Sequence, residues 1–366
     1  MDAARWKRGG VSAIRTRIIS LSYGYTETMS RKITLRTAAT WLPMTAVTAV
    51  ILACVGGAAP ATSIGGGPQV PGVVAAPKPA TPPGSAVIVP PPAIPLHAPL
   101  DVSDARPFAD EGLWRALATT ADGRPAVQGT EVRAQGTGET AAVAWIHQPD
   151  VRFELHPGYE QPGGTWSQPD MLPRDKRKGL LATWNGGFLM YQSGGGFYLD
   201  GRQHGPLRDG AASEVFFKDG SMTVGRWGRD VSMTTRVEGV RQQLHLLVDD
   251  GRIANDVDSL FTWGVTDAGA TYVRRSGVGV TAQGDVVYAI GPLLSPRSLA
   301  LALQQAGAVR AMELDINISW PSFMAYDSSR DPLKPKPFKF GNFPRAAERY
   351  FSPSARDFVA VYGRSD

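Results

Sequence analysis

Residues Ser276 to Ile318 read SGVGVTAQGDVVYAIGPLLSPRSLALALQQAGAVRAMELDINI, and this stretch decides the predicted fold. Two apolar runs flank Ala282-Gln-Gly-Asp285, a short glycine-containing loop that is typical of a tight hairpin turn. Ser295 can cap a helix, Pro296 fits its first turn, and Gly307 is placed to end it. A last apolar run follows the helix. The stretch therefore predicts a strand–turn–strand–helix–strand unit.

Short apolar runs punctuated by glycine continue on both sides of this unit. A second hairpin is predicted where Lys218-Asp-Gly-Ser221 joins two such runs. A second helix is expected over Pro344–Phe351, and residues Asp110–Thr119 fit either a helix or a strand. The fold class is therefore α+β: a single domain of mostly antiparallel or mixed β-sheet with a few packed helices.

The residues before this domain have a different character. Residues 31–36 are basic, 41–55 are apolar and 57–61 are small, which is the order of a secretory signal or an uncleaved anchor. Residues 59–100 hold 12 prolines and predict a semi-extended linker. We expect a head and signal segment over 1–58, a linker over 59–100 and a folded domain over 101–366. Cys54 fits either a lipidation box or a plain cysteine inside the signal.

Charge gives no case for a nucleic-acid partner. The chain carries 38 Lys and Arg against 33 Asp and Glu, but eight of the basic residues and two of the acids lie within residues 1–58. The remainder is nearly neutral, with 30 basic and 31 acidic residues. A basic patch that could track phosphates is therefore not predicted in the folded part. We expect an extracytoplasmic protein whose contact with a membrane is limited to the N-terminal segment.

A polar row runs through the last predicted strand of the unit. Its members are Glu313, Asp315, Asn317 and Ser319, and the residues between them are apolar. Because alternate residues of a strand share a face, the row forms either a wet outer face or the floor of a polar site. The strand directly follows a helix, which favours a place inside the sheet. Two carboxylates at this spacing suit acid–base work at a glycosidic bond.

Asn185-Gly-Gly-Phe188 follows a predicted strand. Gly186 and Gly187 permit close approach of the backbone, so this turn can present the Asn185 amide and free N–H groups to a ligand. The alternative is an ordinary Asn-Gly turn.

Arginine and histidine supply further candidates. Arg208 lies in a charged, glycine-rich loop with His204, and Arg275 precedes a strand in which glycines alternate. Arginine can hold a phosphate through its fork of donors, and histidine can transfer protons near neutral pH. The alternatives are a loop of self-paired ions and an arginine at a sheet edge. No phosphate-binding loop, nucleophile elbow or paired-histidine motif occurs, so we predict no cofactor and no metal.

In this order, the segments resemble the phosphodiester glycosidase family over about Leu180 to Tyr362. Asn185–Phe188 is similar to the family's Asn-Gly-Gly-Phe segment, and Arg275–Val280 to its Arg-(Ser/Thr)-x-x-Gly strand. Gly291–Asp315 resembles its helix and following strand. The family then usually continues Leu-Asp-Gly-Gly-Gly-Ser-Ser, whereas this chain reads Leu-Asp-Ile-Asn-Ile-Ser-Trp over 314–320.

The resemblance implies hydrolysis of a sugar-1-phosphodiester in a cell-envelope glycan. A phosphate leaving group is already acidic, so the site needs charge stabilisation more than protonation. Asp315 would attack the anomeric carbon or stabilise charge there, and Asn185 would orient the sugar or the anomeric oxygen. The remaining assignments are Arg275 and Arg208 to phosphate, Glu313 or His204 to proton transfer, and Gly186, Gly187, Asn317 and Ser319 to substrate contact.

Two other hypotheses stay open. Residues 316–318 replace the family's glycines, so the domain can instead be a non-catalytic module that binds an envelope glycan. Trp184, Trp263 and Trp320 would then either stack on sugar rings or pack in the core. The third hypothesis is an exported scaffold without a ligand.

Overall fold

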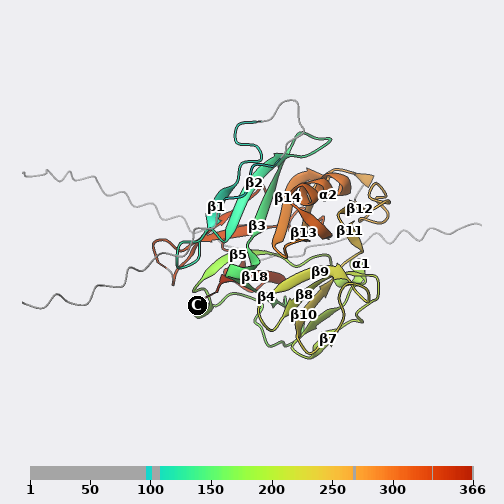
Figure 1. Ribbon diagram of the computed structural model, residues 1–366. Coiled ribbons are helices and arrows are strands. Elements are labelled where there is room, and N and C mark those ends of the chain that lie inside the picture. The colour runs from blue at the N-terminus through green and yellow to red at the C-terminus, as the bar shows by residue number, and fades with distance from the viewer. Residues whose placement is uncertain (1–95, 101–107, 267–268, 332, 365–366) are drawn as a thin grey trace, which may run out of the picture. The chain divides into compact units, whose positions relative to one another are not determined.

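The computed structural model describes residues 96–100, 108–266, 269–331 and 333–364. The predictions for the segment 1–58 and for residues 59–95 of the linker lie outside these ranges. The described chain is mostly β-sheet with few helices (Figure 1). Every pair of neighbouring strands within its three sheets is antiparallel. Within these ranges, no helix has both the length and the hydrophobicity needed to cross a membrane.

The largest sheet has eight strands and contains the unit predicted from sequence. In spatial order its strands are β1 (Arg115–Ala118), β2 (Val127–Arg133), β3 (Thr140–Ile146), β14 (Val286–Leu294), β13 (Val273–Thr281), β15 (Ala308–Asp315), β11 (Leu246–Asp249) and β12 (Arg252–Ile253). The predicted hairpin joins β13 to β14, and β15 returns beside β13 in the interior of the sheet.

Two five-stranded sheets complete the β-structure. One has the order β7 (Arg202–His204), β6 (Phe197–Leu199), β10 (Val237–Gln242), β8 (Ala212–Phe217) and β9 (Met222–Arg226). The other has the order β17 (Lys336–Lys339), β16 (Phe323–Asp327), β5 (Leu180–Asn185), β18 (Phe358–Gly363) and β4 (Val151–His156). The second predicted hairpin joins β8 to β9.

Helix α2 (Pro296–Gln305) lies beside β13 and β14 (Figure 1). The Ser295 hydroxyl accepts from Ser298 N at 3.0 Å, and the Ser298 hydroxyl accepts from Ser295 N at 2.8 Å. This reciprocal capping satisfies two backbone donors that the first turn would otherwise leave open. Gly307 follows the helix with φ +94°, so the predicted start and end of the helix are confirmed. Shorter helical segments among the described residues include α1 (Met190–Ser193) and 3₁₀ turns at Gln148–Asp150, Arg174–Lys176 and Arg349–Phe351.

Both faces of the central strands of the eight-stranded sheet are buried. On β14, Val286, Tyr288 and Ile290 join a core cluster that also draws on both five-stranded sheets. Val287 and Ala289 point to the opposite face, in a cluster with α2. This period of two is what a strand between two packed layers requires.

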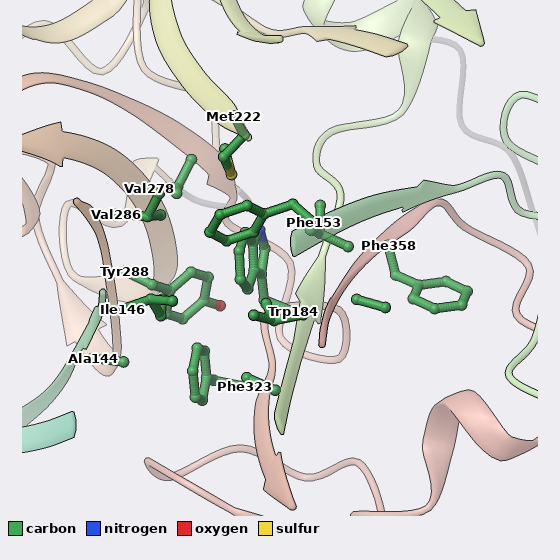
Figure 2. Packing of buried hydrophobic residues seen from close by; sticks show 14 of the residues in the cluster. Ala144, Ile146, Phe153, Trp184, Met222, Val278, Val286, Tyr288, Phe323 and Phe358 are labelled. Carbon is green, nitrogen blue, oxygen red and sulfur yellow. The ribbon is translucent and has the colours of Figure 1, made fainter. Parts of the chain in front are cut away.

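Aromatic rings join the sheets at the centre of the first cluster. Figure 2 shows Trp184 of β5 and Phe323 of β16 beside Tyr288 of β14. The rings of Trp184 and Phe323 are parallel with centroids 6.3 Å apart, and Tyr288 lies 5.1 Å from Phe323. Strand β5, which ends at Asn185, is therefore packed directly against the sheet that carries Asp315.

Two predicted elements are shorter than expected. The last strand of the unit ends at Asp315 rather than Ile318, because Asp315 Oδ1 accepts from Asn317 N at 2.9 Å and turns the chain. The predicted helix over Pro344–Phe351 is only a 3₁₀ turn at Arg349–Phe351. The side chains of Arg345 and Arg349 instead donate to the backbone carbonyls of Ser319 and Trp320. The ambiguous residues 110–119 contain strand β1.

Candidate functional site

A register shift separates the two carboxylates of β15. Ser276 of β13 pairs with Asp315, but the next residue, Gly277, pairs with Glu313. Two residues of β15 therefore oppose one of β13, which is a β-bulge. The bulge breaks the alternation that would have placed Glu313 and Asp315 side by side on one face. The regular alternation assumed for the predicted acid–base pair is thus interrupted, and each carboxylate has its own arginine.

Glu313 is paired with Arg275. Arg275 Nη1 lies 2.7 Å from Glu313 Oε1, and both side chains are fully buried. Arg275 also donates to the carbonyls of Leu294 and Trp263 at 2.8 and 3.1 Å. Burial raises the pKa of Glu313 to about 7, while the Arg275 charge acts against this rise. The predicted phosphate ligand Arg275 is therefore committed to a buried ion pair, on the side of the sheet where Trp263 and Leu294 pack.

Asp315 is paired with Arg356, a residue that the sequence did not single out. Arg356 Nη1 lies 2.6 Å from Asp315 Oδ2, and Asp315 is only 2% exposed. Burial raises the pKa of Asp315 to about 6, although Arg356 and the N–H groups of Asn317 and Ile316 favour its charged form. A carboxyl group that titrates near neutral pH is suited to both attack and proton transfer.

Asn317 and Ser319 lie beyond the strand, on an exposed turn. Asn317 Oδ1 accepts from Ser319 N at 2.9 Å, repeating the contact that Asp315 makes with Asn317 N. The two residues therefore do not share a strand face with Asp315. Ile316 is half-buried, and a Cβ added at Gly264 would lie 2.4 Å from Ile316 Cδ1. The 316–320 turn is thus closed against the loop that contains Gly264.

Asn185 is a buried hub between the two sheets. Its Oδ1 accepts from the Tyr288 hydroxyl at 2.8 Å and from Ser322 N at 3.1 Å. Its Nδ2 donates to the Ser276 hydroxyl at 3.1 Å. Ser276 is the strand partner of Asp315. A single residue, Ser276, therefore connects Asn185 to the end of the strand that carries the carboxylate. The structure thus brings Asn185, Ser276 and Asp315 together from three separate segments.

Three buried residues, Arg241, Gln243 and Asp357, hold the turn after Asn185, and we call them the clamp. Gln243 Nε2 donates to the Gly186 carbonyl at 3.1 Å, and Gln243 Oε1 accepts from Phe188 N at 3.2 Å. The backbone carbonyl of Asp357 accepts from Gly186 N at 2.9 Å. Arg241 bonds to the Phe188 carbonyl and to the Asp357 carboxylate, whose Oδ2 lies 2.6 Å from Arg241 Nε.

The clamp explains the two glycines. A Cβ at Gly186 would lie 2.2 Å from Asp357 Oδ2, and one at Gly187 would lie 1.7 Å from Gln243 Nε2. These are approaches that only glycine allows. Gly186 N is occupied by Asp357 rather than free for a ligand, which differs from the prediction of an open N–H group.

His204 and Arg208 lie elsewhere. His204 is exposed on edge strand β7, where it pairs with Phe197. Arg208 Nη2 donates to the Ser193 carbonyl at 2.8 Å and to the Gln243 carbonyl at 3.4 Å. Arg208 therefore contacts the clamp at the backbone of Gln243. No contact among the described residues brings His204 to Asp315.

Sequence reasoning missed the arginines around Trp320. The guanidinium carbons of Arg345, Arg349 and Arg356 lie 4.6, 4.8 and 4.4 Å from the centre of the Trp320 ring. The ring face is negative and attracts cations, so the three charges gather there. The only signal in the sequence was their number between residues 345 and 356, which the predicted helix obscured.

Two of the three tryptophans named in the glycan-binding hypothesis are too buried to stack on a sugar ring. Trp184 and Trp263 are fully buried, which confirms core packing for both. Trp320 is half-buried beneath arginines.

Access to Asp315 is restricted in the described structure. A surface hollow of about 500 Å³ lies between the turn after β2 and helix α2, and its lining includes Val132, Gly136 and Leu301 but not Asp315. Among the described residues, no group of three or more His, Cys, Asp or Glu side chains is arranged to hold a metal ion. In this structure Asp315 is therefore largely shielded from solvent.

Comparison with known proteins gives weak similarity in structure alone. A scan against protein families finds no match, and a search of curated proteins finds none either. The catalytic domain of zebrafish N-acetylglucosamine-1-phosphodiester alpha-N-acetylglucosaminidase, auto-inhibited by its pro-peptide, is similar with a TM-score of 0.43 and 16% identity, covering 69% of this chain and 88% of that chain. A hypothetical protein from Synechocystis is similar with a TM-score of 0.36 and 12% identity, covering 66% of this chain and 63% of that one. Similarity at this level carries no conclusion about activity.

Proposed function

We propose that the chain is an exported hydrolase that cleaves sugar-1-phosphodiester bonds in cell-envelope glycans. One observation carries the proposal: the three segments that resemble the phosphodiester glycosidase family meet at a buried carboxylate. Asn185 Nδ2 donates to Ser276 Oγ at 3.1 Å, and Ser276 is the strand partner of Asp315. Export is supported by the basic, apolar and small-residue order of residues 31–61.

In this mechanism Asp315 is the reacting carboxylate. It attacks the anomeric carbon or stabilises positive charge there, and the bond between that carbon and the phosphate oxygen breaks with its electron pair leaving on phosphate. Water then completes the free sugar, and the phosphomonoester departs. Arg356 holds Asp315 in its charged form until the substrate arrives. Asn185 and Ser276 fix the position of the strand end.

The deciding experiment compares the wild type with Asp315→Asn on a panel of sugar-1-phosphodiesters, with released sugar as the readout. Asp258→Asn is the matched control, because Asp258 forms an exposed ion pair with Arg297. We expect release to fall by about a thousandfold or more in Asp315→Asn, as for loss of a reacting group, and to stay unchanged in Asp258→Asn. Release that persists in Asp315→Asn would end the proposal.

A second candidate is a module that binds an envelope glycan without cleaving it. The observation that favours it is the 2% exposure of Asp315, together with the contact between Ile316 and the Gly264 loop. Affinity for the phosphodiester with no release of sugar, unchanged in Asp315→Asn, supports this candidate over the first.

A further inference from the structure

Three arginines converge on three consecutive carbonyl groups of the 316–320 turn. Arg274 Nη1 donates to the Ile318 carbonyl at 2.7 Å, and Arg345 Nε donates to that of Ser319 at 3.0 Å. Arg349 Nη1 donates to the Trp320 carbonyl at 2.7 Å. The arginines come from β13 and from the segment before β18, so the tertiary structure alone brings them together.

These three arginines lack acidic partners. Within the described residues, none of them has a carboxylate oxygen within ion-pair distance. The nearby acid, Asp315, is already paired with Arg356. Arg345 and Arg349 repel each other, and this repulsion adds to burial in lowering the pKa of Arg345. Arg345 and Arg349 share the Trp320 ring but form no ion pair with a carboxylate among the described residues, so their positive charge is available to an anion.

Unused donors remain on each guanidinium group. Arginine has five N–H donors in a planar fork. Arg274 uses Nε and Nη1, with Nε donating to the Asn342 carbonyl at 3.3 Å. In hydrogen bonds to other described residues, Arg345 uses Nε alone, and Arg349 uses only Nη1, which also donates to the Ser322 hydroxyl at 2.8 Å. The three side chains are partly exposed, so their remaining donors can reach a ligand in solvent.

We infer that Arg274, Arg345 and Arg349 form a binding site for a phosphate group at the 316–320 turn. Fork-shaped donors match tetrahedral phosphate oxygens, and a dianion or monoanion neutralises the uncompensated charge. The inference rests on the proposed function in one respect: it assigns the phosphate of the sugar phosphodiester to this cluster, in place of Arg275 and Arg208. The turn that carries the cluster also binds Asp315 through Asn317 N, so phosphate at this site would contact the segment next to the candidate carboxylate.

Calorimetric titration of the full chain with inorganic phosphate at low salt tests the site. The test variants are Arg345→Gln and Arg274→Gln, because glutamine keeps a donor for the turn carbonyl but removes the charge. Arg297→Gln is the control, since Arg297 is exposed and paired with Asp258. We expect each test variant to bind phosphate about tenfold more weakly, the loss of one charged contact, and the control to bind as the wild type does.

Unchanged affinity in both folded test variants, or no phosphate binding by the wild type at millimolar concentration, overturns the inference. Circular dichroism establishes whether each variant is folded, and if only one of them folds, unchanged affinity in that variant overturns the inference. Because binding is measured without turnover, the site and the activity can fail separately. Sugar release without phosphate affinity would contradict the phosphate site but not the proposed function. Phosphate affinity without sugar release would contradict the proposed function but not the phosphate site.

Discussion

The guanidinium group of Arg356 lies 2.6 Å from the carboxylate of Asp315, although 41 residues separate them in the chain. The next residue, Asp357, is paired with Arg241 at 2.6 Å. Two consecutive residues before β18 thus hold the end of β15 and the turn after β5. The segment 356–357 is therefore the connection between the candidate carboxylate and the Asn185 turn.

Arg356→Met should destabilise the protein in a pH-dependent way. Removing one partner of a buried pair leaves an uncompensated charge and costs about 3–5 kcal/mol. Without Arg356 the pKa of Asp315 rises further above its unfolded value, so the folded state holds a proton that the unfolded state releases. The loss should therefore be large at pH 8 and small at pH 5, as measured by urea unfolding. An equal loss at both pH values would mean that packing, not charge, is what Arg356 provides.

Glu214→Gln should stabilise the protein at alkaline pH. Glu214 is fully buried, its Oε1 accepts only a 3.4 Å bond from Trp184 Nε1, and burial raises its pKa to about 8. Because the folded pKa is raised, the unfolded state releases this proton first. Stability of the wild type should then fall between about pH 4.5 and pH 8 by up to about 1.4 kcal/mol per pH unit from this group. The variant should lack this slope in a series of unfolding curves across that range. An unchanged slope would show that Glu214 is ionised in the fold.

Tyr288→Phe should cost more than Tyr362→Phe. The Tyr288 hydroxyl donates to Asn185 Oδ1 at 2.8 Å, whereas the Tyr362 hydroxyl is buried without a hydrogen-bond partner among the described residues. Loss of the first hydroxyl leaves Asn185 with one donor fewer, at a cost of about 1–3 kcal/mol. Loss of the second should be neutral or slightly stabilising. Thermal unfolding of the two variants measures the difference in stability. Equal losses would contradict the conclusion that the hydrogen bonds of Asn185 stabilise the contact between the two sheets.

Gly186→Ala should disturb the clamp and the proposed activity together. The new Cβ would lie 2.2 Å from Asp357 Oδ2, so the Arg241–Asp357 pair or the turn must shift. We expect a loss of about 1–3 kcal/mol in unfolding free energy, together with reduced sugar release. Gly363→Ala is the control, because its Cβ would meet only ordinary contacts at 3.6 Å and beyond. A Gly186→Ala variant as stable and active as this control would contradict the clamp.

Local chemistry explains the parts of the fold that could be predicted. The ends of α2 follow from Ser295, Pro296 and Gly307, which act on their own neighbours, and the hairpin at 282–285 follows from a loop too short for another path. The strand end was missed for an equally local reason. Asp315 and Asn317 bind the backbone two residues ahead and stop the strand, and an alternating pattern does not reveal such contacts.

The candidate site could be predicted only in part. Asn185 and Asp315 were singled out by residue type and by their order in the chain. In the structure both contact the same residue of β13, Ser276. The charged partner of Asp315, Arg356, was not predicted, because an ion pair between distant segments leaves no periodic signal. Arg356 is one of several arginines near the C-terminus, and nothing in its neighbours distinguishes it.

The sequence by itself determined the capped helix, the hairpins and the apolar faces of the strands, since these depend on residues a few positions apart. Only the tertiary structure decided that Glu313 and Asp315 separate, because a bulge opposite Ser276 and Gly277 changes the register by one residue. It also decided which arginine pairs with each of these two acids. Burial removes water from these charges, so the choice of partner depends on the folded neighbourhood rather than on residue type.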